Sequence, residues 1–242
     1  MKIEDKQAVF ANPSESCPYS TVLLDVDGTL LDFDEAERRG VRIVMQRHGI
    51  EPTKALERRY HEINKKYWKA FEQGEISKQD IIDNRFVEFF KTLGKEVDAA
   101  GVESLYREQL DSCAILIEGA LDICSYLYKR YQLYVVTNGI SHTQYRRLKD
   151  SGLDRYFSNI FVSEDTGSQK PKAEFFNYCF ARIPEQDLSR IIIIGDSLTS
   201  DIQGGKNAGI TTCWVNFGRQ PRMAGIKPDY EVNRLEELKK FL

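Results

Sequence analysis

The fold is decided by the ten residues 21–30, TVLLDVDGTL. The first four are apolar or β-branched, which is typical of a short strand buried on both faces inside a parallel sheet. Asp25 and Asp27 follow, and strand residues two apart point the same way. If the pairing continues that far, both carboxylates face one point at the carboxyl edge of the sheet, where open α/β sheets bind ligands. Their repulsion is tolerated when a cation lies between them or one carries a proton. The alternative is that Asp27-Gly28 is only a turn that ends the strand.

Strand and helix patterns alternate through the second half of the chain. Short apolar runs predict strands, and the amphipathic segments between them predict helices. This alternation is typical of a parallel sheet covered on both faces. We therefore predict an α/β fold with a Rossmann-like, doubly wound parallel sheet. The further strands are predicted at 133–136, 159–162, 191–194 and 211–215, and the helices at 119–130, around Tyr145 and Leu148, at 173–182, before Gly209 and at 235–238.

The segment 34–114 carries helical patterns and no strand signal. Because it lies between the first strand and the second, we predict an all-helical cap domain inserted into the core. The predicted organisation is an N-terminal arm at 1–20, a core built from 21–33 and 115–242, and the cap at 34–114. We expect the cap to close over the site and exclude water, with hinges near 32–34 and 114–118.

One predicted cap helix, residues 53–73, carries a stripe of large apolar side chains at helical spacing. Such a stripe is typical of a helix face that packs into a core. His61 and Trp68 fall off this stripe. Each of them either reaches the cleft and stacks on a base, or lies at a partner surface or in solvent. The stripe consists of Tyr60, Ile63, Tyr67 and Phe71.

The composition is that of an ordinary globular protein and argues against several classes. The 242 residues carry a formal net charge of −3, which argues against a nucleic-acid polymer as partner. The five cysteines are odd in number and never in Cys-x-x-Cys spacing, so a reducing cytoplasmic setting fits better than a disulfide framework. No apolar run approaches the ~20 residues of a membrane span, and residues 1–20 lack the apolar centre of a signal peptide. We expect a cytoplasmic monomer or homodimer.

Polar residues follow the predicted strands at the edge where Asp25 and Asp27 lie. Each is ordinary by itself: a threonine-asparagine-glycine triplet forms turns, a lone lysine is a surface residue, and an aspartate before a helix is an N-cap. Together they offer carboxylates that suit Mg²⁺, and a hydroxyl, N–H groups and an ammonium group that suit phosphoryl oxygens. The additional residues are Thr137 and Asn138 after 133–136, Lys170 in the loop after 159–162, and Asp196 and Asp201 after 191–194.

In chain order, the motifs DVDGTL, VVTNG, KP and IIIIGDSLTSD resemble those of the haloacid dehalogenase (HAD) superfamily, and the insert resembles its helical cap. The resemblance covers nearly the whole chain after the arm. It implies that Asp25 is the nucleophile and forms an aspartyl-phosphate. It also implies that Asp27 protonates the leaving oxygen and then activates the hydrolytic water.

The resemblance implies roles for the other polar residues as well. Thr137 would hold the phosphoryl group with the Asn138 amide beside it, and Lys170 would balance the negative charge. Asp201 would orient Lys170 or a metal-bound water. The implied cofactor is Mg²⁺, held by the Asp25 carboxylate, the Asp27 backbone carbonyl and Asp196.

The second aspartate also bears on the reaction. The dehalogenases of this superfamily lack it, because halide leaves without an acid, so Asp27 implies a phosphatase or phosphotransferase. Residues 137–171 are similar to the pyrimidine 5′-nucleotidase branch, which implies a small phosphorylated metabolite, above all a nucleoside monophosphate, as substrate. Glu118-Gly119 departs from the pattern, because many relatives carry a proline before this glycine; the difference bears on hinge stiffness and not on the chemistry.

Three alternatives remain at this point. One is a sugar-phosphate or phosphoglycolate phosphatase. Another is a phosphotransferase like β-phosphoglucomutase, which uses the same aspartyl-phosphate. A third is a non-catalytic regulatory protein that binds a phosphorylated ligand. Loss of Asp25, Asp27 or Lys170 would mark this last class, and all three residues are present.

Overall fold

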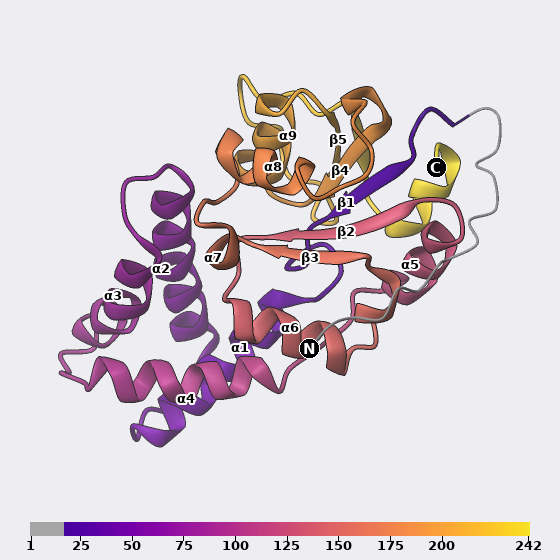
Figure 1. The fold of residues 1–242 in the computed structure, drawn as a ribbon. Helices are drawn as coiled ribbons and strands as arrows, with labels where there is room; N and C mark the ends of the chain where they lie inside the picture. Colours follow the sequence, from indigo (N-terminus) through magenta and orange to yellow (C-terminus); the bar gives the residue numbers. More distant parts are fainter. Residues whose placement is uncertain (1–16) are drawn as a thin grey trace.

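The computed structural model describes residues 17–242, in which a parallel sheet is flanked by helices and a separate group of helices lies beside one edge (Figure 1). The six strands have the order β3-β2-β1-β4-β5-β6, and each neighbouring pair is parallel. This order confirms the predicted Rossmann-like, doubly wound sheet. The strands are β1 (Thr21–Leu24), β2 (Gln132–Thr137), β3 (Asn159–Val162), β4 (Ile191–Gly195), β5 (Thr211–Val215) and β6 (Tyr230–Val232).

Strand β1 lies inside the sheet, with β2 on one side and β4 on the other. Its alternate residues face opposite layers: Leu24 packs into one hydrophobic cluster and Leu23 into another. Both faces of the sheet are covered, and this explains why β1 after Thr21 and β4 are runs of apolar residues instead of alternating between apolar and polar ones.

Helices cover the two faces of the sheet (Figure 1). Helices α5 and α6 and the C-terminal segment pack on the face that contains Leu24, and α8 packs on the face that contains Leu23. The helices of this part are α5 (Ala120–Tyr128), α6 (Ser141–Asp150), α7 (Ser163–Thr166), α8 (Ala173–Phe180) and α9 (Gln203–Asn207), with short helical turns at Asp154–Tyr156, Leu188–Arg190, Leu198–Ile202 and Leu235–Lys240.

The four helices between β1 and α5 form a group with its own hydrophobic cluster, which we call the cap (Figure 1). Local sequence explains where two of them begin. The Thr53 side chain accepts from Leu56 N, and Ser77 forms a capping box with Asp80. The cap helices are α1 (Phe33–Arg47), α2 (Lys54–Glu72), α3 (Lys78–Lys91) and α4 (Ala99–Asp111).

The apolar stripe of α2 packs into the cap cluster along most of its length and reaches the sheet domain at its end. Tyr60 and Ile63 are buried in the cap cluster, and Tyr67 packs partly buried against it. Phe71 is also buried, but it lies where the cap meets the sheet domain, because its carbonyl accepts a hydrogen bond from Gln169 Nε2 at 3.2 Å. The stripe therefore contributes to the cap core and to the contact between cap and core.

A buried polar network crosses the cap interior. Arg85 on α3 forms a bidentate ion pair with Glu103 on α4, and its guanidinium also donates to Asn64 Oδ1 at 3.0 Å. Asn64 Nδ2 donates to Glu37 Oε2. The other oxygen of this carboxylate, Oε1, lies 2.7 Å from His61 Nδ1. All but His61 are buried, so each charge depends on the next partner for its stabilisation.

The chain passes between sheet and cap twice, through residues 31–33 and 113–116, which we call the crossing segments. They run side by side: Asp32 N donates to Ile115 O at 2.8 Å, and Leu31 forms an antiparallel bridge with Leu116. Main-chain hydrogen bonds thus join the two places where hinges are predicted.

Some details of the structure differ from the sequence predictions. Strand β6 has no counterpart among the predicted strands, because its three residues are too short a run to stand out. The helix predicted around Tyr145 and Leu148 is present as α6, but Tyr145 is 43% exposed whereas Leu148 is buried. Of the predicted loose arm, residues 1–16 lie outside the described residues, whereas Tyr19 is buried against the sheet domain. Within residues 17–242, no helix has the length and apolar character that crossing a membrane requires.

Candidate active site

The predicted site residues gather at the carboxyl edge of the sheet, around the ends of β1, β2 and β4. Asp25 N still donates to Ile194 O at 3.0 Å, so the pairing of β1 with β4 extends to the first aspartate. Asp27 lies beyond it in a turn, where it forms a bridge with Leu31. Asp25 therefore still belongs to the paired strand, whereas Asp27 belongs to the turn after it, and the two carboxylates have different neighbours.

Lys170 is the centre of the charge arrangement. Its side chain is 1% exposed, and its ammonium group donates to Asp25 Oδ1 at 2.7 Å, Asp201 Oδ1 at 2.6 Å and Val136 O at 2.7 Å. Three acceptors use all three N–H donors of the lysine. The structure thus joins three predicted site residues that lie far apart in the chain.

The ionisation of these groups follows from burial and from their neighbours. Burial raises the pKa of Asp25 to about 8, opposed by the charge of Lys170 and assisted by that of Asp201. The pKa of Lys170 is raised above its usual value, because Asp201 and Asp25 outweigh the effect of burial. Lys170 is therefore a stable positive charge in the site, and a further cation beside Asp25 would favour the ionised form of the Asp25 carboxyl group.

The carboxylates of Asp25, Asp196 and Asp201 fit a divalent cation, because one oxygen from each lies within 4.8 Å of the others. Both oxygens of Asp201 already accept hydrogen bonds, from Lys170 Nζ and from Ser197 N at 3.0 Å. Among the described residues, no side chain donates to Asp25 Oδ2 or to the Asp196 carboxylate. Asp25 Oδ2 and the two carboxylate oxygens of Asp196 are therefore available to a hard cation such as Mg²⁺.

Gly28 allows Asp196 to come close to the turn after Asp27. Its φ of +78° lies in the left-handed region, and a Cβ at this position would overlap with the Asp196 carboxylate. On the other side, the Trp214 indole donates to the Asp196 carbonyl at 2.8 Å. Asp196 is thus held beside the Asp27–Gly28 peptide, whose carbonyl is the third predicted metal ligand.

Thr137 and Asn138 at the end of β2 form the next part of the site. Both are buried, and Thr137 Oγ1 accepts from Gly139 N at 3.1 Å, so its hydroxyl hydrogen is available to a phosphoryl oxygen. The Asn138 side chain instead binds the backbone of Lys170. The Asn138 group that can face a phosphoryl group is therefore its backbone N–H.

The carboxylate of Asp27 has partners that the sequence analysis missed. Arg147 on α6 forms an ion pair with Asp27 Oδ1, and Gln144 Nε2 donates to Asp27 Oδ2. Arg147 is fully buried, whereas the Asp27 side chain is 24% exposed. The available signal was an arginine and a glutamine on the same helical face as the apolar Leu148, where side chains pack inward.

The cap also brings charged residues to this edge. Lys78, at the start of α3, donates to Gly139 O at 2.8 Å and to Ser163 Oγ at 2.9 Å. Glu72, at the end of α2, accepts from Thr199 Oγ1 at 2.6 Å, and burial raises its pKa to about 7. Sequence alone gave no sign of either residue, because each lies at a helix end among other charged residues.

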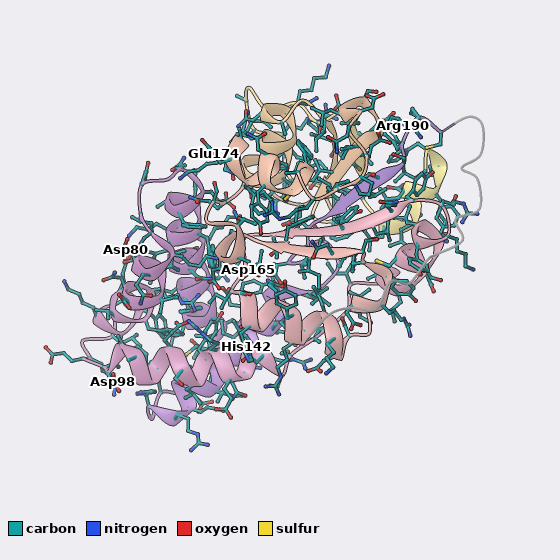
Figure 2. All side chains as sticks on the ribbon, in the orientation of Figure 1. Asp80, Asp98, His142, Asp165, Glu174 and Arg190 are labelled. Carbon is teal, nitrogen blue, oxygen red and sulfur yellow. The ribbon has the colours of Figure 1, made fainter. Side chains whose placement is uncertain are left out.

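His61 and Trp68, the candidates for stacking on a base, both have partners inside the cap. His61 binds Glu37, and Trp68 packs edge-on against the Phe71 ring at 5.8 Å between centroids. Figure 2 shows a different histidine, His142, where the start of α6 meets the end of α4, with its Nε2 3.4 Å from Asp111 Oδ2. Helix α6 is therefore tied to the cap as well as to Asp27.

Comparison with known proteins gives the family. Residues 19–209 match the family of haloacid dehalogenase-like hydrolases. The chain belongs to this family. The HAD-hydrolase YfnB of Bacillus subtilis is 47% identical over 220 residues, which cover 91% of this chain and 94% of that protein. The fold, the resemblance stated above and the expectation of a hydrolase are thereby confirmed.

Two pyrimidine 5′-nucleotidases are similar to this chain over nearly their whole length. The pyrimidine 5′-nucleotidase PynA of Streptococcus pneumoniae is 38% identical, with 91% of this chain and 93% of that protein covered. The pyrimidine 5′-nucleotidase YjjG of Escherichia coli is 30% identical, with 93% and 98% covered. A crystal structure of YfnB, described as bound to magnesium and as revealing interdomain movement, has a TM-score of 0.88 and covers 92% of this chain and 97% of its own.

Proposed function

We propose that this HAD hydrolase cleaves phosphomonoesters through an aspartyl-phosphate on Asp25, and that its substrates are pyrimidine nucleoside monophosphates. The observation that supports the reaction best is the buried contact between Lys170 and Asp25. The lysine binds Oδ1 at 2.7 Å, so the proposed nucleophile lies beside a fixed positive charge that can offset the negative charge of an incoming phosphoryl group. The two nucleotidases among the relatives support the substrate class.

In the first half-reaction, a carboxylate oxygen of Asp25 bonds to phosphorus as the ester P–O bond breaks. The leaving oxygen takes the proton carried by Asp27. The Thr137 hydroxyl and the Asn138 N–H donate to the phosphoryl oxygens, and the positive charge of Lys170 balances the negative charge of Asp25 and of the phosphoryl group.

In the second half-reaction, a water oxygen bonds to phosphorus while Asp27 takes the water proton. The bond between Asp25 and phosphorus breaks, and inorganic phosphate leaves. Both aspartates return to their initial state, with Asp27 protonated and Asp25 ionised, so the cycle balances without another reactant.

The donor set fits Mg²⁺, which we propose as the cofactor, held by Asp25, Asp196 and the Asp27 carbonyl. When bound, this cation supplies positive charge that neutralises the phosphoryl oxygens and favours ionised Asp25. Asp201 contributes by holding Lys170 and by accepting from Ser197 N.

We propose that the cap (residues 34–114) excludes water and contributes to substrate choice, as a lid over the sheet edge. Its contacts through Lys78 and Glu72 lie beside the loops that carry Gly139 and Thr199. A cytoplasmic location is part of the proposal, since all five cysteines are free thiols. The partner is a small molecule, and the protomer acts as a monomer or homodimer.

The test measures phosphate release from UMP, dUMP, AMP, GMP, glucose 1-phosphate and phosphoglycolate, with and without Mg²⁺. We expect release with Mg²⁺ and a preference for the pyrimidine nucleotides. Asp25→Asn is expected to lower the rate at least about 10³-fold, because the nucleophile is lost. Asp150→Asn, an exposed aspartate on α6, is the matched control and should retain the rate.

The outcomes separate the alternatives. A preference for sugar phosphates or phosphoglycolate keeps the chemistry and overturns the substrate assignment. Isomerisation of a sugar phosphate primed by a bisphosphate, with little free phosphate, would identify a mutase. Absence of both reactions in the unmodified protein, together with binding of phosphorylated ligands, would leave a regulatory protein and overturn the proposal.

A further inference from the structure

Arg147 is a fully buried arginine with one carboxylate partner among the described residues, Asp27. Gln144 lies three residues earlier on the same face of α6, where helix residues are neighbours, and donates to the other oxygen of the same carboxylate. One helix face thus holds both oxygens of Asp27. A buried arginine is costly unless it is paired, so this contact decides where the guanidinium lies.

The guanidinium is itself held by both crossing segments. Arg147 Nε donates to Cys113 O at 3.1 Å, in the segment that returns from the cap. The Phe33 ring, in the segment that enters the cap, lies 5.7 Å from the guanidinium carbon. Arg147 is therefore fixed from the sheet domain and from both connections to the cap, as a residue that positions another side chain needs to be.

Two atoms of this arrangement have no hydrogen-bond partner in the described part of the chain: Arg147 Nη2 and Gln144 Oε1. Both are buried, and buried polar atoms without a partner are uncommon and costly. Gly139 accommodates the same contact, because a Cβ there would overlap with the Gln144 side chain. The Arg147–Gln144 pair is therefore poorly explained as a device for stability alone.

We propose that Arg147 and Gln144 are positioning residues that hold the Asp27 carboxylate for proton transfer, an inference that rests on the proposed function. The charge-assisted ion pair with Arg147 anchors Oδ1, and the weaker neutral contact from Gln144 restrains Oδ2. Oδ2 is then the oxygen that exchanges the proton, first with the leaving oxygen and later with water. In the structure both oxygens of Asp27 accept hydrogen bonds, as they do in an ionised carboxylate. This ionised state is the one that takes a proton from water in the second half-reaction.

The test separates proton transfer from folding by changing the leaving group. A nucleoside alkoxide needs a proton to leave, whereas 4-nitrophenolate leaves as an anion. In Arg147→Met, we expect phosphoryl transfer from UMP to slow about 10²-fold, within the usual contribution of a general acid. The first turnover of 4-nitrophenyl phosphate should change less than about threefold, and an aspartyl-phosphate should then accumulate because water activation is slow. Rapid mixing with acid quench measures both.

Three further variants test whether the effect comes from the contacts with Asp27 and not from substitution on α6 in general. Gln144→Met should show the same pattern more weakly, and Arg147→Lys should recover part of the UMP rate because it keeps the charge. Arg146→Met, at an exposed neighbour on α6, should leave both rates unchanged. Thermal unfolding of each variant shows whether it is folded under the assay conditions.

The inference would be overturned if both substrates slowed equally in a folded Arg147→Met or Gln144→Met protein, or if neither slowed. If the unmodified protein forms no phosphoenzyme with either substrate, both the proposed function and this inference are wrong. Equal slowing of the two substrates in a folded variant, or no slowing of either, contradicts this inference alone, so the two failures are distinguishable.

Discussion

Asn138 and Lys170 exchange two hydrogen bonds between a side chain and a backbone. Lys170 N donates to Asn138 Oδ1 at 3.0 Å, and Asn138 Nδ2 donates to Lys170 O at 2.9 Å. Both residues are buried. This reciprocal contact joins the end of β2 to the loop before α8, and it fixes the backbone from which the Lys170 side chain reaches Asp25.

Asn138→Asp tests the importance of this contact. The new side chain can accept from Lys170 N, but it cannot donate to Lys170 O, so two acceptors face each other in a buried place. We expect a loss of about 1–3 kcal/mol in the free energy of unfolding, and at least about a tenfold fall in kcat for the preferred substrate, because misplacing a positioned group is costly. Asn159→Asp, at an exposed position, is the control for both measurements. Unchanged kcat in the Asn138 variant would contradict this role.

Asp196 should control metal affinity. Asp196→Asn removes a negatively charged oxygen donor from the predicted Mg²⁺ site, and we expect Mg²⁺ binding to weaken at least about tenfold, because Mg²⁺ is bound largely through carboxylates. Titration calorimetry of the protein without substrate measures this directly, and chelation with EDTA should abolish phosphate release by the unmodified protein. Asp187→Asn, which is exposed and lies before β4, should bind Mg²⁺ as the unmodified protein does. Equal affinities for the two variants would count against the assignment.

The buried ion pair between Arg85 and Glu103 should be essential to the cap. Glu103→Gln leaves the Arg85 charge buried with too little compensation, and the expected loss is about 3–5 kcal/mol in the free energy of unfolding. Urea denaturation followed by circular dichroism provides the measurement. Glu108→Gln, one turn along α4 and exposed, should be close to neutral. A small effect at Glu103 would mean that the neighbouring Asn64 and the aromatic rings compensate for the charge.

His61 should make the stability of the protein depend on pH. The hydrogen bond to Glu37 raises the pKa of His61 above its usual value of 6.5, and Asp34 raises it further, while partial burial and Lys65 oppose them. A raised pKa in the folded state means that the His61–Glu37 contact stabilises the protein fully below pH 6.5 and loses that contribution as pH rises through the folded-state pKa.

His61→Gln should therefore lower the melting temperature at pH 6 more than at pH 8. Scanning calorimetry at a series of pH values gives the comparison. Glu37→Gln removes the acceptor, so the same His61 substitution made in that background should show little pH dependence. A difference that stays constant from pH 5 to pH 9 would show that the contact does not depend on the charge of His61.

Much of the sheet domain could be predicted from local sequence. The apolar run at 191–194 and the run of β-branched and apolar residues at 211–215 became strands β4 and β5, because a strand buried on both faces favours such side chains. Strand β6 could not be predicted in this way, since a three-residue edge strand is stabilised by its neighbour β5 and not by its own pattern.

The candidate site also has a part that the sequence predicts and a part that it does not. The sequence by itself determined which groups stand at strand ends: Asp25 and Asp27 after β1, Thr137 at the end of β2, and Asp196 after β4. Strand direction alone sends these groups to one edge, whatever the details of packing. These residues were thereby enough to predict the kind of chemistry that we propose for this protein.

Only the tertiary structure decided the partners of each group. Lys170 meets Asp25 and Asp201, Arg147 and Gln144 hold Asp27, and Lys78 reaches across from the cap. The local pattern of α6 places Arg147 on the same face as the apolar Leu148, but it does not show which carboxylate the guanidinium meets. The physical reason is that burial of a charge is favourable only when a partner from elsewhere in the chain is present, and folding alone brings the two together.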